Sequence, residues 1–410
     1  MKTMACSKMW TSINVQPDRK QIKTCCHRKG PSVTTEELLR LGASVFIDHP
    51  YNMADRAQFI DQNQIPDSCK ICKDSWPNSL WDIWNSWRDR DFTADQLEAL
   101  KTADLVEKIE IALSNKCNQT CMYCYPERSS DWAKIMGREI TEDEAWNAAF
   151  KAALHDYIRL HVSQRATEIS YNMLGGEPLL NPDLYEFIDS IITAHEHDKH
   201  PTRLREFVIT TNLNVKPALV QRLLDVIDQT PGWHWRIKCS IDAIGAVGET
   251  IRDGLSVAQY QENLELILGH PRIYVEILPS VSVLSIPAFA EMLAWAKAIM
   301  HKHGLLDQHG HRWQFGVNMV EDPSAMHPGN LSDSYKHHID DCIAELMELP
   351  EHGMKTKLLR HMENIRRLIG TRTSAAHKAQ MRTWFIKQGE LKKRDYWQDF
   401  ALLTDLLGPR

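Results

Sequence analysis

The sequence lacks the features that mark membrane, secreted and polyanion-binding proteins. No apolar run approaches the roughly 18–20 residues that a transmembrane helix needs, and the first ten residues, MKTMACSKMW, lack the apolar centre of a signal peptide. Positive charge is also scarce, because 48 Lys and Arg face 54 Asp and Glu, a formal net charge of −6. A nucleic-acid-binding protein normally carries a basic patch, so generic binding to a phosphate backbone is disfavoured. We expect a cytoplasmic protein without membrane or nucleic-acid partners, and 410 residues suit one large domain or two to three smaller ones.

Cysteine, in contrast, is plentiful and unevenly distributed. Buried structural cysteines should scatter, as Cys239 and Cys342 do, because a free thiol behaves as a small apolar group. In a reducing compartment a disulfide framework is disfavoured, so clustered cysteines predict metal or redox chemistry. Eight of the ten lie in the first third of the chain: Cys6, Cys25, Cys26, Cys69, Cys72, Cys117, Cys121 and Cys124.

The sharpest motif is Cys117-Asn-Gln-Thr-Cys121-Met-Tyr-Cys124, which directly follows the strand-like segment KIEIALS. A strand that ends in a tight loop lets three thiolates meet at one point. A structural zinc site uses four protein ligands, so three leave a position for an exogenous ligand. Thiolates also bind iron–sulfur clusters, and a four-iron cluster with three cysteine ligands leaves one iron open to a chelating small molecule.

This triplet is similar to the signature of the radical S-adenosylmethionine (radical SAM) superfamily. The resemblance implies that Cys117, Cys121 and Cys124 hold a catalytic 4Fe-4S cluster that binds S-adenosylmethionine. It also implies that the aromatic ring of Tyr123 lies near the adenine of that cofactor. For the triplet taken alone, a zinc knuckle is the alternative.

From about residue 105, strand-like and amphipathic helical segments alternate. Six β/α units in a row predict parallel strands with right-handed crossovers. We therefore expect an α/β fold, a partial (β/α)6 TIM-like barrel at residues 105–322, with reactive groups at the carboxyl ends of its strands. Thr141 and Glu144 form a capping-box pattern that predicts the start of one helix. The strand-like runs are 106–114, 168–174, 206–211, 235–241, 273–283 and 313–320.

The second strand of this barrel ends in Gly175-Gly176-Glu177-Pro178. Two glycines allow the backbone to approach a ligand closely, and the Glu177 carboxylate is able to accept a hydrogen bond from an ammonium group. In radical SAM enzymes a GGEP stretch binds the amino group of the methionyl moiety. The resemblance carries that role to these four positions.

Polar residues also follow the third and fourth strands. The run SIDA…IRDG resembles the ribose- and carboxylate-binding segment of the superfamily, which implies that Ser240 and Arg252 hold the cofactor. A guanidinium clamps a carboxylate with two parallel hydrogen bonds, and a surface salt bridge is the alternative role for Arg252. Asn212 and Asp242 are expected to make polar contacts around the ribose.

Residues 1–104 carry the second group of cysteines. The segment that starts at Cys6 predicts a strand and a turn leading to the Cys25-Cys26 pair. The layout resembles the twitch domain, a truncated form of the SPASM domain, although here it precedes the barrel and the turn at 16–20 lacks the usual glycine. The resemblance implies an auxiliary 4Fe-4S cluster, with Cys26 as the spare thiol and one structural zinc as the alternative. The expected ligands are Cys6, Cys25, Cys69 and Cys72.

Residues 323–410 read as a helical C-terminal extension, with helical patterns at 332–349, 355–369, 375–388 and 395–407. The resemblance implies a radical SAM enzyme of oxidoreductase or transferase type, in which one electron cleaves S-adenosylmethionine to methionine and a 5′-deoxyadenosyl radical, which abstracts a substrate hydrogen. It also implies an external one-electron donor such as flavodoxin or ferredoxin. The expected substrate is a peptide or small molecule, with epimerisation or dehydrogenation of a sugar or cyclitol as the alternative. The competing class is a non-enzymatic zinc-binding interaction protein.

Overall fold

In the computed structural model, residues 4–25, 28–69, 85–87, 90–139, 143–306, 312–350 and 353–410 are described. Their strands are separated by helices over most of the chain, as the sequence pattern predicts. The strands are β1 (Ser12–Gln16), β2 (Gln21–Lys23), β3 (Lys108–Ala112), β4 (Ile169–Leu174), β5 (Arg205–Thr211), β6 (His234–Cys239), β7 (Ile273–Ile277), β8 (Ser280–Val281), β9 (Trp313–Phe315) and β10 (Asn318–Met319).

Within the described residues, eight strands form one sheet in the order β2-β1-β3-β4-β5-β6-β7-β9. The pairs β3–β4, β6–β7 and β7–β9 are parallel. From β3 to β9 the strands follow one another in the sheet as they do along the chain, which is the order of a partial (β/α)6 barrel. These are the six predicted strands, so the predicted α/β class is confirmed.

The helices before and within the barrel segment fill the intervals between these strands. The N-terminal ones are α1 (Lys8–Thr11), α2 (Thr35–Leu41), α3 (Pro50–Asp61) and α6 (Ala94–Leu100). The later ones are α7 (Ser130–Ile135), α8 (Glu144–Leu160), α9 (Leu184–Ala194), α10 (Pro217–Gln229), α11 (Gly245–Ile251), α12 (Val257–Gly269) and α13 (Phe289–Lys302).

The C-terminal region is helical, as predicted. None of the helices in the described ranges is both long enough and apolar enough to cross a membrane. The helices of this region are α14 (Lys336–Met347), α15 (Gly353–Leu368), α16 (Ala375–Lys392), α17 (Tyr396–Asp399) and α18 (Leu402–Leu407).

The chain divides into two compact units. Unit 1 comprises residues 1–114 and 140–208, and unit 2 comprises residues 115–139 and 209–410. The division therefore falls inside β5 and again directly before the three-cysteine motif. The expected domain limits near residues 104 and 322 remain predictions.

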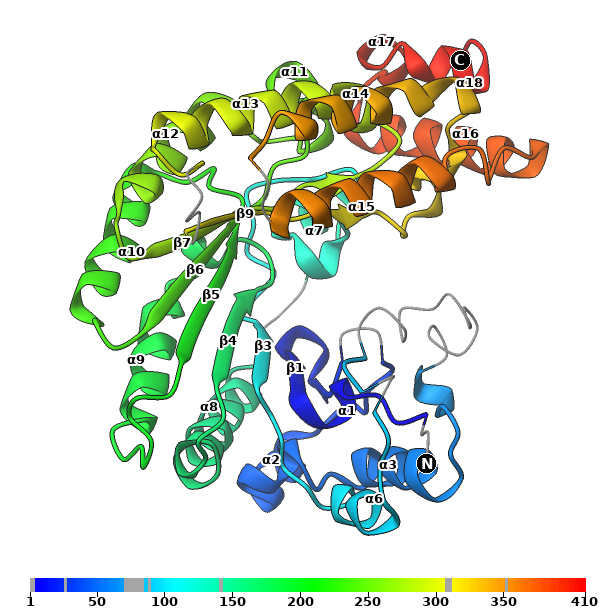
Figure 1. The fold of residues 1–410 in the computed structure, drawn as a ribbon. Helices are drawn as coiled ribbons and strands as arrows, with labels where there is room; N and C mark the ends of the chain where they lie inside the picture. The colour runs from blue at the N-terminus through cyan, green and yellow to red at the C-terminus, as the bar shows by residue number, and fades with distance from the viewer. Residues whose placement is uncertain are drawn as a thin grey trace. The chain divides into compact units, whose positions relative to one another are not determined.

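In unit 1, β1 pairs with β2 in antiparallel fashion and with β3 in parallel fashion, so the N-terminal hairpin extends the sheet (Figure 1). The turn between β1 and β2 is a 3-10 helix at Pro17–Arg19, followed by Lys20 at φ 51°. Lys20 thus adopts the left-handed conformation that favours glycine. The predicted strand and turn are confirmed, and the turn forms without the glycine that is usual in the twitch pattern.

The predicted start of α8 is wrong by two residues. The N-cap is Asp143, whose carboxylate accepts a hydrogen bond from the Trp146 amide at 2.9 Å. The same carboxylate pairs with Lys20 at 2.5 Å, an interaction with a residue far away in sequence. Thr141, the predicted cap, lies outside the described residues.

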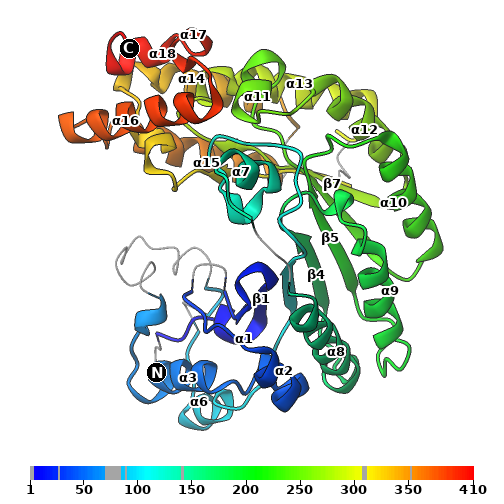
Figure 2. The ribbon, with the colours of Figure 1, turned by 180° about the vertical axis from the view of Figure 1, so that it is seen from behind.

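In unit 2, β6, β7 and β9 are covered by amphipathic helices. Helix α12 packs on β7 and α10 packs beside α12 (Figure 2). Apolar side chains of the strands, among them Ile237, Val275 and Phe315, are buried under this layer. A short parallel pair, β8 with β10, continues from the ends of β7 and β9.

Candidate functional site

The cysteine loop, residues 115–125, follows β3 and contains Cys117, Cys121 and Cys124. Side chains at the start of α7 bind alternate residues of this loop, so its backbone is fixed at three points. The bonds join Ser130 Oγ to the amide and carbonyl of Cys117 (3.1 and 3.0 Å), Ser129 Oγ to the carbonyl of Gln119 (2.6 Å) and Trp132 Nε1 to the carbonyl of Cys121 (2.9 Å).

The intervening residues of the loop bind the segment that carries Arg252. The Thr120 amide donates to the Asp253 carbonyl at 2.8 Å, and the Met122 amide donates to the Ile251 carbonyl at 2.9 Å. The cysteine loop is therefore held between α7 on one edge and residues 251–253 on the other. This places the cysteine motif and the IRDG motif, which the sequence analysis treated as two signals, in direct contact.

Gly254, the last residue of the IRDG motif, permits this contact. Its φ is +97°, and a Cβ atom there would lie 2.6 Å from the carbonyl oxygen of Asn118. Only glycine fits such a backbone conformation at such a close approach. The side chain of Asn118 continues the contact by donating to the carbonyl of Asn214 at 2.5 Å.

The three thiols differ in exposure. Cys121 is buried, whereas Cys117 and Cys124 are partly exposed. Burial raises the pKa of the Cys121 thiol, and it raises that of Cys124 to about 12. Because the thiolate is the form that binds metals, cluster binding at this loop must displace these protons.

The donor set fits an iron–sulfur cluster. Within the described ranges, no three His, Cys, Asp or Glu side chains are placed to hold a single metal ion. A 4Fe-4S cluster makes a different demand, because each thiolate binds its own iron and the sulfurs stand farther apart than the ligands of one ion. Soft thiolates select iron–sulfur clusters over hard cations. The predicted ligation by Cys117, Cys121 and Cys124 stays a prediction.

Arg252 and Tyr123 meet at the buried carboxylate of Asp242. Tyr123 Oη donates to Asp242 Oδ2 at 2.6 Å, and Arg252 Nη2 donates to Asp242 Oδ1 at 2.9 Å. The backbone amide of Ser280 donates to the same Oδ1 at 2.7 Å. The side chains of Arg252 and Asp242 are 7% and 0% exposed, so the alternative of a surface salt bridge for Arg252 is wrong.

The electrostatics of this group follow from its burial. Burial raises the pKa of the Tyr123 phenol well above its usual value. Burial opposes the charge of Arg252, but the Asp242 carboxylate, together with the nearby Tyr123 and Cys121, more than offsets it and keeps the pKa of the guanidinium above its usual value. Arg252 is therefore a permanent cation. Among the described residues its Nε has no hydrogen-bond partner, which leaves a donor for an anionic ligand.

The other predicted cofactor residues of unit 2 lie near these groups. Asn212 Nδ2 donates to Asn118 Oδ1 at 3.1 Å and lies 3.9 Å from Cys117 Sγ. The Ser240 amide donates to the Thr211 carbonyl at 2.8 Å, which joins the ends of β5 and β6. The structure thus brings Asn212 to the cysteine loop. The ribose contacts expected of Asn212, Ser240 and Asp242 stay predictions.

The GGEP stretch follows β4 in unit 1 and lies against the end of β3. The Gly176 amide donates to the Ser114 carbonyl at 2.8 Å. Gly175 has a φ of +128°, and a Cβ atom there would meet the same carbonyl oxygen at 2.5 Å. Glu177 is buried and accepts from the Leu179 amide at 3.0 Å, so it caps the 3-10 helix that begins at Pro178. Binding of an amino group by this stretch stays a prediction.

Three of the four expected auxiliary ligands are described. Cys6 and Cys69 both pack against the apolar cluster around Trp10 and Phe59. The Lys29 amide donates to the Ser68 carbonyl at 2.9 Å, which brings the segment after Cys25 beside Cys69. Burial raises the pKa of the Cys69 thiol to about 12. The other two cysteines of the region, Cys72 and Cys26, lie outside the described residues.

Sequence reasoning missed the residues that support the cysteine loop. Ser129, Ser130 and Trp132 lie shortly after the motif, and the serine at the helix start is a local signal that could have identified them. Lys392, at the end of α16, donates to the Thr120 carbonyl. No local signal in the sequence identifies Lys392, because its partner lies in a distant part of the chain.

Comparison with known proteins gives limited but specific similarity. No family model matches the chain. A GTP 3′,8-cyclase of Sulfurovum sp. (strain NBC37-1) is 28% identical over 120 residues, 29% of this chain and 31% of the relative. A GTP 3′,8-cyclase of Sulfurimonas denitrificans is 28% identical over 121 residues, 30% of this chain and 32% of the relative. The chain thus matches about a third of the length of these curated relatives.

Two solved structures of anSMEcpe with bound AdoMet are also similar. The native protein is 14% identical with a TM-score of 0.37 and covers 59% of each chain. The polyhistidine-tagged protein is 16% identical with a TM-score of 0.40 and covers 59% of this chain and 60% of the other.

The cysteine motif, the partial-barrel strand order and the match to the cyclases point to one class of protein, an α/β-fold protein with a three-cysteine loop after its first barrel strand. The match to these relatives confirms the predicted resemblance to the radical SAM superfamily.

Proposed function

We propose that this chain is a radical SAM enzyme that cleaves S-adenosylmethionine reductively and abstracts a hydrogen atom from its substrate. One observation carries the proposal. The loop with the three thiols is hydrogen-bonded through Thr120 and Met122 to the segment that carries Arg252. Thiols for a cluster and a buried cation for a carboxylate are therefore parts of a single built site.

Each residue of the site has a defined role in this proposal. Cys117, Cys121 and Cys124 would hold the 4Fe-4S cluster, which supplies one electron and an open iron for the cofactor. Arg252 binds the cofactor carboxylate through charge-assisted hydrogen bonds. Asp242 orients Arg252 and the Tyr123 ring, because it accepts hydrogen bonds from both.

The remaining cofactor contacts come from groups beside the strand ends. Glu177 and the glycines before it would receive the amino group. Ser240 and Asn212 would bind the ribose. Asn212 is linked to the cysteine loop through its 3.1 Å hydrogen bond to Asn118, which supports a role for it beside the cluster.

A second 4Fe-4S cluster is proposed for the N-terminal region, with Cys6, Cys25, Cys69 and Cys72 as ligands. Supporting it, Cys69 lies beside a segment that starts at Cys25, and Cys6 packs on the same apolar cluster as Cys69. A full set of four ligands leaves no iron open, so this cluster would transfer electrons or stabilise the fold. A structural zinc ion at the same thiols is the alternative.

The reaction needs a one-electron donor and a substrate. We propose a flavodoxin or ferredoxin as the donor, in the reducing cytoplasm where thiols stay available for clusters. The substrate is a peptide or a small molecule that the enzyme oxidises or otherwise modifies. The names of the cyclase relatives point to a nucleotide, and epimerisation or dehydrogenation of a sugar or cyclitol is the alternative chemistry.

Iron analysis of anaerobically reconstituted protein tests the proposal. Two clusters predict about eight irons per chain, and Cys117→Ala and Cys6→Ala should each remove about four. Cys342→Ala, a buried cysteine outside both sets, is the matched control and should keep the full content. Addition of S-adenosylmethionine should change the electron paramagnetic resonance signal of the reduced wild type. A colourless protein that retains zinc would overturn the proposal.

A further inference from the structure

The end of α16, in the helical C-terminal extension, contacts the cysteine loop directly. Lys392 Nζ donates to the carbonyl oxygen of Thr120, the residue before Cys121. The side chain of Lys392 is only 2% exposed and pairs with Asp253 at 3.3 Å. Its ammonium also lies 4.6 Å from the centre of the Trp132 ring, close enough for a cation–π interaction. One buried cation therefore touches the loop, α7 and the IRDG segment together.

The local backbone fixes the place of this lysine. Helix α16 ends at Lys392, and the next residue, Lys393, has a left-handed φ of 54°. The Arg394 amide donates to the Gly389 carbonyl at 2.9 Å. A Cβ atom on Gly389 would lie 2.6 Å from the Arg394 carbonyl oxygen, so glycine is required for this tight turn. The turn closes the helix with Lys392 held at its end.

A second cation from the same turn reaches the segment around Arg252. Arg394 Nη2 donates to Thr250 Oγ1 at 3.2 Å, and Arg394 Nε pairs with Asp399 at 2.7 Å. Asp253 Oδ2, the partner of Lys392, also accepts from Thr120 Oγ1 at 3.0 Å. The turn after α16 thus contacts the cysteine loop and both sides of Arg252.

General stability does not explain a lysine at this position. A buried ion pair is often no more stabilising than apolar side chains of similar size, because removing charges from water costs more than the pairing returns. A methionine would fill the same space on Trp132. What methionine lacks is the hydrogen bond to the Thr120 carbonyl and a fixed positive charge beside the loop.

We propose that Lys392 is a positioning residue of the iron–sulfur site, which makes the C-terminal extension part of that site. The inference rests on the proposed function, because it assigns a role toward the cluster at Cys117, Cys121 and Cys124. The hydrogen bond to Thr120 holds the loop between the first two cysteines. The positive charge favours the more negative, reduced form of the cluster and raises its reduction potential.

Three substitutions at this position separate the hydrogen bond from the charge. Lys392→Met removes both, Lys392→Gln keeps a donor without the charge, and Lys392→Arg keeps the charge. Lys387→Met is the matched control, because Lys387 is an exposed lysine of the same helix. Reconstituted full-length proteins are compared by the rate of iron loss to a chelator and by the reduction potential of the cluster. Thermal unfolding of the cluster-free proteins reports folding separately.

The Lys392 variants should differ from one another in iron loss and in reduction potential. Lys392→Met should lose iron at least several-fold faster than Lys387→Met and have a lower reduction potential. Lys392→Gln should have the same lowered reduction potential as Lys392→Met but lose iron more slowly than Lys392→Met does. Lys392→Arg should keep the wild-type reduction potential. If Lys392→Met does not fold, the comparison of Lys392→Gln with Lys392→Arg decides the question.

Two negative results of this experiment would have different meanings. If the wild type binds no cluster, the proposed function is wrong and this inference falls with it. If the wild type binds the cluster but the Lys392 variants match Lys387→Met in iron loss and potential, only the inference about Lys392 is wrong.

Discussion

Two buried carboxylates in this protein have similar partners but lie at opposite ends of barrel strands. Asp198 precedes β5 in unit 1, and Asp242 follows β6 in unit 2. Each binds an arginine, and each belongs to a polar group that includes a tyrosine. In (β/α) barrels, groups at the amino ends of the strands serve stability, whereas those at the carboxyl ends serve function. The two groups differ in the hydrogen bonds that surround the arginine.

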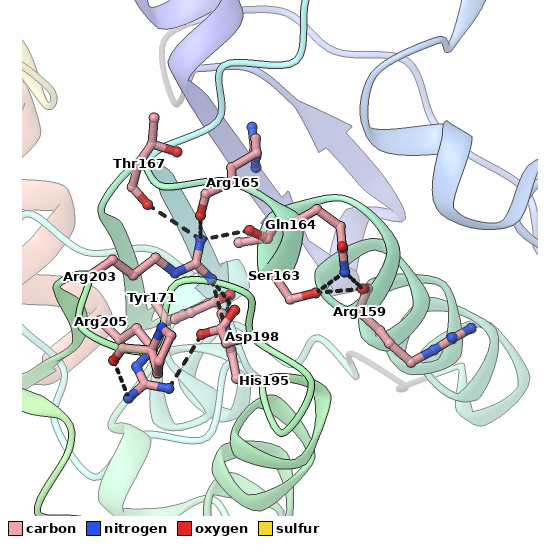
Figure 3. Close-up of polar contacts among 12 residues, drawn as sticks. Arg159, Ser163, Gln164, Arg165, Thr167, Tyr171, His195, Asp198, Arg203 and Arg205 are labelled. Carbon is pink, nitrogen blue, oxygen red and sulfur yellow. Dashed lines mark hydrogen bonds and ion pairs between the residues drawn. The ribbon is translucent and has the colours of Figure 1, made fainter.

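In the Asp198 group, backbone carbonyls accept hydrogen bonds from the arginine (Figure 3). Arg203 Nη2 donates to Asp198 at 2.8 Å, and Arg203 Nη1 donates to the carbonyls of Val162 and Arg165 at 2.6 and 2.8 Å. His195 Nδ1 lies 3.0 Å from Asp198, and its Nε2 lies 2.7 Å from the Tyr171 hydroxyl. These bonds tie the loops before β4 and β5 together, so the group stabilises the fold.

The Asp242 group is connected instead to the cysteine loop. Among the described residues, the side-chain hydrogen bond of Arg252 goes to Asp242, and backbone carbonyls do not occupy its guanidinium. Tyr123 comes from the cysteine loop itself. The same chemical components therefore form a structural cluster at one strand end and a candidate ligand site at the other.

The largest expected effect is on the free energy of unfolding and comes from a substitution in the Asp198 group. Arg203→Met should lower the free energy of unfolding by about 3–5 kcal/mol, because it removes the shortest ion pair of a buried carboxylate and leaves the Val162 and Arg165 carbonyls without this donor. Denaturant unfolding of the cluster-free protein measures it. Arg159→Met, at an exposed pair with Asp156, is the control and should change stability by less than about 1 kcal/mol. Equal effects at the two sites would refute the structural role of the Asp198 group.

The matching change at the second group should affect the cofactor more than the fold. Arg252→Met should lower the free energy of unfolding by about 2 kcal/mol, because Asp242 keeps the Tyr123 hydroxyl and the Ser280 amide as donors. Affinity for S-adenosylmethionine should fall by about tenfold or more, since a charged hydrogen bond is lost. Isothermal titration of the reconstituted proteins measures the affinity. An unchanged affinity would show that Arg252 does not bind the cofactor.

The pH dependence of stability should reveal the neutral histidine in the first group. Burial lowers the pKa of His195 from 6.5 to about 4. The unfolded chain therefore binds a proton between these values while the folded chain does not, and stability falls as pH falls through that window. Between pH 7 and pH 5, the free energy of unfolding of the wild type should fall by about 2 kcal/mol more than that of His195→Gln. Parallel pH profiles for the two proteins would contradict the assignment.

The smallest expected effect is on stability and comes from the close contact between Gly254 and the cysteine loop. Gly254→Ala places a Cβ atom 2.6 Å from the Asn118 carbonyl, whereas Gly245→Ala, also at positive φ, meets nothing within 4 Å. Gly254→Ala should therefore be less stable than Gly245→Ala by about 1 kcal/mol. It should also bind less iron after reconstitution. If the two alanine variants match in thermal unfolding and iron content, the loop does not depend on that approach.

The sequence predicted the parts of the molecule that local patterns determine. Strand alternation found β3 to β9, and cysteine spacing found the loop after β3, because both signals lie within a few residues. The start of α8 was missed because Asp143 gains its ion pair from the distant Lys20. Lys392 was missed for the same reason, since its contacts to Thr120 and Asp253 exist only in the folded chain.

Formation of 5′-deoxyadenosine is the most direct test of the account. Reconstituted protein is incubated anaerobically with S-adenosylmethionine and a strong one-electron reductant, and the product is measured by chromatography. The account predicts product from the wild type and from Cys342→Ala, and none above background from Cys117→Ala. Product from Cys117→Ala at the wild-type level, or none from a wild type that carries its cluster, would contradict it.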